Sequence, residues 1–106
     1  MYVAMNRFAV NEGFEAGFET IWRTREKLVH DVPGFLEFKL LRGETAEAVT
    51  PYLSHSTWAS KDAFVAWTNS EAFASAHRDA RSPQGTLVGH PEFSGYEVVD
   101  TDEPTA

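Results

Sequence analysis

The chain has 106 residues, 42% of them apolar, and we expect one folded domain over residues 1–100 followed by a short acidic tail at 101–106. Its net charge of −7 argues against nucleic-acid binding. The lack of a run of ~20 apolar residues and of a signal-peptide pattern predicts a cytoplasmic protein that does not cross a membrane. Because cysteine is absent, disulfides, thiolate nucleophiles and thiolate metal sites are excluded.

The first half of the chain is expected to form a strand, a helix and two further strands. Apolar residues occupy both parities of residues 2–10, which predicts a strand covered on both faces. They recur at helical spacing over residues 14–29. After a Pro-Gly break, residues 35–42 and 52–59 are expected to form two strands joined by a polar connection.

The second half begins with a capping signal. Ser60 is suited to cap a helix over residues 61–68, and a further helical segment is expected over 71–81. A polar loop with two prolines and two glycines follows at 82–91, and residues 95–100 are expected to form the last strand. No internal repeat is visible.

The order strand, helix, strand, strand, helix, strand predicts an α+β, ferredoxin-like (split β-α-β) fold. In this fold a four-stranded antiparallel sheet carries both helices on one face. A small domain buries only part of its apolar surface, and the same face of a second copy would cover the open side of the sheet. We therefore expect a homodimer through the sheet face, in the form of a dimeric α/β barrel.

Asn6 is a polar residue on the apolar parity of the first strand. Its amide must find hydrogen-bond partners there or destabilise the fold. Satisfaction by the backbone is the more common explanation for such a group. The functional alternative is an amide directed into a pocket between the sheet and the helices.

His77 follows three small residues at positions 74–76, which would let a planar ligand approach the helix. Phe73, His77 and Arg81 are spaced four residues apart and can share one helical stripe. A helical histidine is more often a surface or core-edge residue, but histidine is also a common axial ligand of haem iron.

Three tryptophans stand out in a chain of this size. Each is most simply explained by core packing, and we place Trp58 in the core. Trp22 and Trp67 could instead line a flat cavity that Phe73 closes. Glycine-rich phosphate loops, HExxH motifs and nucleophile elbows are absent from the sequence.

Three stretches together resemble a known family. They are the first strand with Asn6, the segment SKDAFVAWTNSEAF with Trp67, and the segment AHRDAR with His77. These stretches resemble the antibiotic-biosynthesis-monooxygenase (ABM) superfamily, in particular its IsdG-type haem-degrading branch. The resemblance extends to about residue 99.

The resemblance implies a catalytic set of Asn6, Trp67 and His77. His77 would be the proximal ligand of the haem iron, Asn6 would hydrogen-bond to the oxygen species, and Trp67 would press the porphyrin out of plane. It also implies haem-binding positions at Trp22, Phe73, Arg25 and Arg81, in which the arginines are candidates for the propionates.

The function implied by this branch is oxidative opening of the porphyrin ring, with release of iron and a bilin-type tetrapyrrole. Haem would be both substrate and cofactor, and dioxygen and an external electron donor would be consumed. Two alternatives stay open. One is a cofactor-free monooxygenase of the same superfamily that acts on a quinol or polyphenol, and the other is a haem-binding dimer without turnover.

Overall fold

The computed structural model describes residues 1–25, 29–71, 73–74 and 83–102, with only the backbone of Arg25. The described chain forms four strands and two helices in the expected order. They are β1 (Tyr2–Asn11), α1 (Glu15–Arg25), β2 (Phe35–Arg42), β3 (Val49–Trp58), α2 (Lys61–Thr68) and β4 (Glu92–Glu97).

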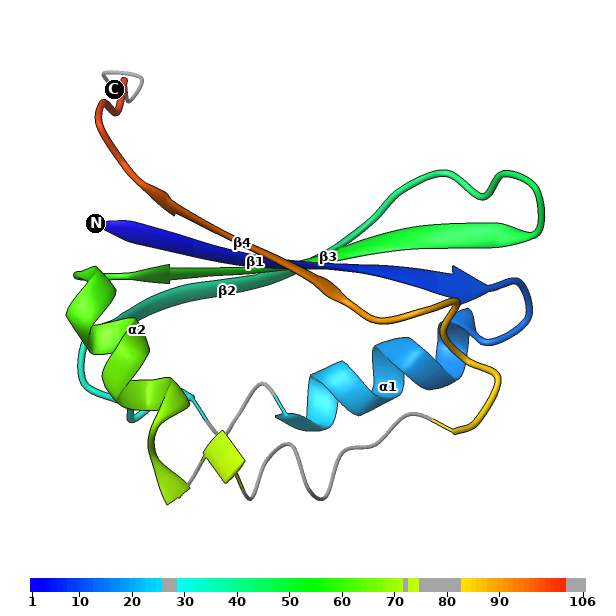
Figure 1. The fold of residues 1–106 in the computed structure, drawn as a ribbon, viewed down its shortest axis with the longest axis horizontal. Helices are drawn as coiled ribbons and strands as arrows, with labels where there is room; N and C mark the ends of the chain where they lie inside the picture. Colours follow the sequence, from blue (N-terminus) through cyan, green and yellow to red (C-terminus); the bar gives the residue numbers. More distant parts are fainter. Residues whose placement is uncertain (26–28, 72, 75–82, 103–106) are drawn as a thin grey trace.

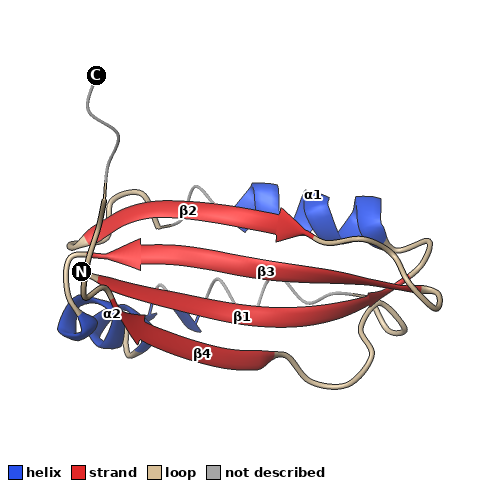
Figure 2. Cartoon of the chain, turned by 90° about the horizontal axis from the view of Figure 1, so that it is seen from above, coloured by secondary structure: helices blue, strands red, loops and turns tan. Residues whose placement is uncertain are grey.

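The four strands form one antiparallel sheet in the order β2-β3-β1-β4. Both helices lie on the same face of this sheet, as Figure 1 shows in side view. Figure 2, seen from above, shows the strands running side by side with the helices behind them. This arrangement confirms the predicted ferredoxin-like α+β fold.

The helix-facing side of the sheet carries two separate core clusters. Buried Val10, Phe18 and Tyr52 form the first cluster, between α1 and the sheet. The second lies between α2 and the other end of the same strands, and its buried members are Tyr2, Ala4, Trp58 and Trp67. Because β1 and β3 contribute to both clusters, each strand has a middle section between them.

Local signals explain the position of α2. The Ser60 hydroxyl accepts a hydrogen bond from the Ala63 backbone N–H at 3.1 Å, as an N-cap does. Gly34 precedes β2 with a positive φ of 83°, and a Cβ built on it would lie 2.5 Å from the Ala63 Cβ. A glycine therefore allows the loop before β2 to approach α2 closely.

The boundaries of β2 and α2 agree with the expected ones, whereas two strands differ. β3 begins at Val49, inside the segment expected to be a loop, because β1 continues to Asn11 and pairs with it there. β4 spans residues 92–97 instead of 95–100, because its last partner on β1 is Tyr2, near the chain's start. Most of the helical segment expected at 71–81 lies outside the described residues.

No helix in the described ranges combines the length and the apolar character that a membrane crossing requires.

Candidate active site

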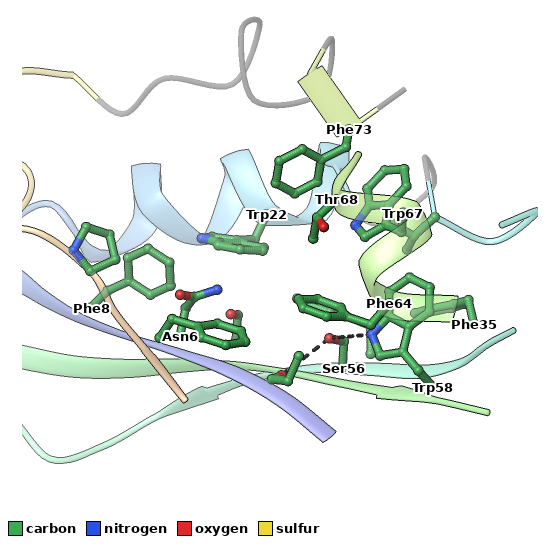
Figure 3. Close-up of a pocket in the computed structure, with 16 residues that line it drawn as sticks. Asn6, Phe8, Trp22, Phe35, Ser56, Trp58, Phe64, Trp67, Thr68 and Phe73 are labelled. Atoms are coloured by element: carbon green, nitrogen blue, oxygen red, sulfur yellow. Dashed lines mark hydrogen bonds between the residues drawn. The ribbon is translucent and has the colours of Figure 1, made fainter. Parts of the chain in front are cut away.

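A cavity of about 420 Å³ lies on the helix-facing side of the sheet. Residues from all four strands, from both helices and from the loops after them form its wall, and Figure 3 shows their side chains converging. The lining residues are Ala4, Asn6, Phe8, Trp22, Val29, Phe35, Phe38, Ser54, Ser56, Trp58, Phe64, Trp67, Thr68, Phe73, Pro91 and Phe93.

Aromatic rings make most of this wall, and they hold one another in place. Trp67 stacks on Trp58 with ring centroids 6.4 Å apart and meets Phe73 edge-on at 5.4 Å. On the opposite side, the Trp22 ring from α1 stacks on Phe38 from β2 at 5.5 Å, with 12° between their planes. The cavity therefore presents flat apolar surfaces, as a planar ligand requires.

Asn6 projects from the middle of β1 into this cavity (Figure 3). In the sheet it is paired with Ser54 of β3 on one side and with Phe93 of β4 on the other. Within the described part of the chain, no hydrogen bond joins the Asn6 amide to another group. The amide keeps its donor and acceptor capacity for a ligand, which favours the functional interpretation over a structurally satisfied side chain.

Two other polar groups of the wall are already occupied. The Ser56 hydroxyl donates to the Ala4 carbonyl at 3.3 Å and accepts from the Trp58 Nε1–H at 2.9 Å. The Thr68 hydroxyl donates to the Val65 carbonyl at 2.8 Å. None of the described lining residues has an ionisable side chain. The described part of this wall can offer hydrogen bonds and aromatic surface but no general acid or base.

Helix α1, which carries Trp22, is tied to β3 by two carboxylates one turn apart. The Tyr52 hydroxyl donates to Glu19 Oε2 at 2.6 Å, and the Thr50 hydroxyl donates to Glu15 Oε2 at 2.9 Å. The hydrogen bond from Tyr52 lowers the pKa of Glu19. Burial, followed by the neighbouring Glu19, raises the pKa of Tyr52 to about 12. These bonds fix the position of α1 and of Trp22 over the sheet.

The structure brings four of the predicted site residues to one cavity, namely Asn6, Trp22, Trp67 and Phe73. His77 and Arg81 lie outside the described residues, and the side chain of Arg25 is not described. The roles assigned to all seven stay predictions. Trp58 is a core residue as expected, at 1% exposure, and it also forms part of the cavity wall.

The sequence interpretation missed several lining residues, above all Ser54. Its alternation with the buried Tyr52 and with Trp58 could have placed it on the helix-facing side of β3. Phe38, Phe64 and Phe93 were also missed as lining residues.

Among the described residues, no group of three or more His, Cys, Asp or Glu side chains could hold a metal ion.

Comparison with known proteins gives matches over most of the chain. The family described as antibiotic biosynthesis monooxygenase matches residues 1–79. Two curated proteins of Mycobacterium tuberculosis, from strains CDC 1551 and H37Rv, are named heme oxygenase (mycobilin-producing). Each is 33% identical to this chain over 91 residues, which cover 86% of this chain and 85% of the relative.

Solved structures show the same fold. The heme-degrader MhuD from Mycobacterium tuberculosis, with two hemes bound in its active site, superposes with a TM-score of 0.77 and 29% identity. The match covers 97% of this chain and 100% of that one. SnoaB, a cofactor-independent oxygenase from Streptomyces nogalater, has a TM-score of 0.72 and 21% identity, with 94% of each chain covered, and shows a shared fold alone.

Proposed function

This chain belongs to the antibiotic biosynthesis monooxygenase family, and from that premise we propose that it is a haem-degrading oxygenase. The reaction would open the porphyrin ring oxidatively, with dioxygen and an external electron donor, and release iron and a bilin-type tetrapyrrole. The similarity to a heme oxygenase and to a structure with bound heme supports this choice of substrate.

The observation that carries the proposal is the composition of the cavity. Aromatic faces surround one open amide, that of Asn6, and the described wall has no ionisable group. A flat, largely apolar macrocycle fits such surfaces, and about 420 Å³ lies within the usual range of ligand pockets. The described wall offers no acid–base residue, which fits a reaction whose chemistry comes from the ligand and the oxidant.

Bound haem would supply the redox chemistry that activates dioxygen, and would itself be consumed. The residues of the chain would bind and orient it. Trp22 and Phe73 would contact the faces and edges of the macrocycle, and the indole of Trp67, held by Trp58, would press on it from a fixed position. The Asn6 amide N–H would donate a hydrogen bond to a polar atom at the reacting face.

Three further residues complete the proposal through the family resemblance. His77 would hold the haem iron through its imidazole. Arg25 and Arg81 would bind the propionate groups as charge-assisted partners.

Titration of the purified protein with haemin tests the proposal. We expect a stoichiometric shift of the Soret band that is lost in His77→Ala and kept in His90→Ala, because His90 is exposed and does not line the cavity. With ascorbate or a reductase under air, the Soret band should decay as haem is degraded. Asn6→Ala should still bind haemin, with a decay slower by about tenfold or more.

Two results would contradict the proposal. Absence of haemin binding would favour a cofactor-free oxygenase that grips a polycyclic phenol in the same cavity. Stoichiometric binding without Soret decay under any reductant would instead favour a haem-binding protein without turnover.

We also propose that a second copy covers the helix-free face of the sheet. Val3 and Met5 are only half-buried on this face, and Leu41 and Tyr96 are exposed there at 43% and 53%. Opposite charges lie side by side on it, including the Glu37–Lys39 ion pair at 2.9 Å, so the face can be complementary to itself. Analytical ultracentrifugation should show a dimer, and Leu41→Lys should shift it to monomer. A monomeric wild type would overturn this proposal.

A further inference from the structure

Ser54 lies on the floor of the cavity, in the middle of β3. It is only 6% exposed, and its neighbours across the sheet are Asn6 of β1 and Leu40 of β2. Within the described ranges, no hydrogen bond involves the Ser54 hydroxyl. The described residues include two buried side-chain polar atoms without a partner, and the Ser54 hydroxyl is not one of them, so it stays accessible from the cavity that Ser54 lines and can bond to a ligand there.

Ser54 and Asn6 are distinct from the other polar groups of the wall. The hydroxyls of Ser56 and Thr68 bond to protein atoms. Within the described residues, the side chains of Ser54 and Asn6 make no hydrogen bond and can both bond to a ligand. Directly opposed residues of antiparallel strands have Cβ atoms about 4.5–5.5 Å apart. A single polar atom above the sheet can therefore reach both the amide and the hydroxyl.

We propose that Ser54 is a second hydrogen-bonding residue of the active site, which acts beside Asn6 on the same polar atom at the reacting face of the bound tetrapyrrole. This inference rests on the haem-degrading function proposed above. The amide N–H and the serine O–H would form a two-donor site in an apolar, water-poor cavity, where each hydrogen bond is stronger than in water. Ser54 would thus help to orient small ligands at that face.

Azide is a suitable probe, because it binds ferric haem iron and accepts hydrogen bonds from nearby donors. The decisive comparison is between Ser54→Thr and Ser54→Val, since their side chains have nearly equal volume and differ in the hydroxyl. We expect haemin-loaded Ser54→Thr to bind azide within about twofold of wild type and Ser54→Val to bind it about three- to tenfold more weakly. Thr57→Val removes a buried hydroxyl from the other face of β3 and should leave azide affinity unchanged.

The same proteins separate this inference from the proposed function. Haemin affinity, measured in parallel, should be equal in the Thr and Val variants at position 54, and the Val variant should be no less stable than the Thr variant, because a structural hydrogen bond of the hydroxyl would make Val the less stable of the two. Equal azide affinities in these two variants would overturn the role of Ser54 while haemin binding stands. Failure of the wild type to bind haemin would overturn both.

A second background tests direct contact with the ligand. In Asn6→Ala protein, Ser54→Val should still weaken azide binding relative to Ser54→Thr, because the hydroxyl bonds to the ligand itself. Disappearance of that difference would show that Ser54 acts only through Asn6, and the proposed two-donor site would be wrong.

Discussion

Replacing Tyr52 with phenylalanine removes one hydroxyl and tests how α1 is held on the sheet. That hydroxyl donates to the Glu19 carboxylate at 2.6 Å, and Tyr52 itself is only 1% exposed. A hydrogen bond to a charged group contributes about 1.5–3 kcal/mol. The Glu19 side chain is 20% exposed and keeps Arg42 at 2.9 Å, so we expect a loss of about 1–2 kcal/mol near neutral pH.

The pH dependence gives this prediction its sharpest form. The hydrogen bond from Tyr52 is the largest cause of the lowered pKa of Glu19. Its stabilising effect is therefore complete above the unfolded-state pKa of about 4.3 and is lost as the pH falls through the lower folded-state value. Urea unfolding of wild type and Tyr52→Phe should show a large difference at about pH 6 and a smaller one at about pH 3.5.

Tyr2→Phe is the matched control, because Tyr2 is also buried, at 6% exposure, and its hydroxyl makes no hydrogen bond within the described residues. It should unfold like wild type at both pH values. The reasoning would be refuted if the Tyr52→Phe difference were the same at both pH values, or if the control lost as much stability as Tyr52→Phe.

Three further predictions concern stability, each measured by urea unfolding. Ser56→Ala leaves the buried Trp58 Nε1–H without its acceptor and should cost about 1–3 kcal/mol, and a cost near zero would contradict this. Gly34→Ala should cost more than about 1 kcal/mol, because φ is positive there and a Cβ would collide with Ala63, and unchanged stability would show that the loop adjusts freely. Because the folded-state pKa of Tyr52 is raised to about 12, its contribution should persist below about pH 10 and be lost as the pH rises through 12, so a pH-independent stability in this range would refute it.

The sequence predicts best those elements whose limits are set locally. The Ser60 cap fixes the start of α2, and the Pro-Gly break before residue 35 fixes the start of β2. The starts and ends of β3 and β4 depend on how far β1 extends beside them, which is a non-local property. Propensity therefore predicted both strands, but it misplaced the start of β3 and both limits of β4 by three residues and the end of β3 by one.

The candidate site shows the same division. Asn6 stood out from the sequence because a polar residue interrupts an apolar parity, and Trp67 stood out through its size and the family resemblance. For Ser54, the alternation with Tyr52 and Trp58 indicates only the face of β3, because serines and threonines are frequent in this strand and the register is needed to place it beside Asn6. The role proposed for Ser54 depends on which hydrogen bonds form in the folded chain, and residue types do not show this.

The two core clusters explain why a polar site can exist in so small a protein. On β1, the buried Ala4 belongs to the cluster under α2 and Val10 to the cluster under α1, and Asn6 lies between them. On β3, Ser54 lies in the same way between Tyr52 and Trp58. Neither helix packs its own core over this middle section, so polar side chains there interrupt no apolar contact within a cluster, and the cavity opens where they stand. The spacing of the two helices on one sheet face thus determines where the cavity lies and which side chains of β1 and β3 face it.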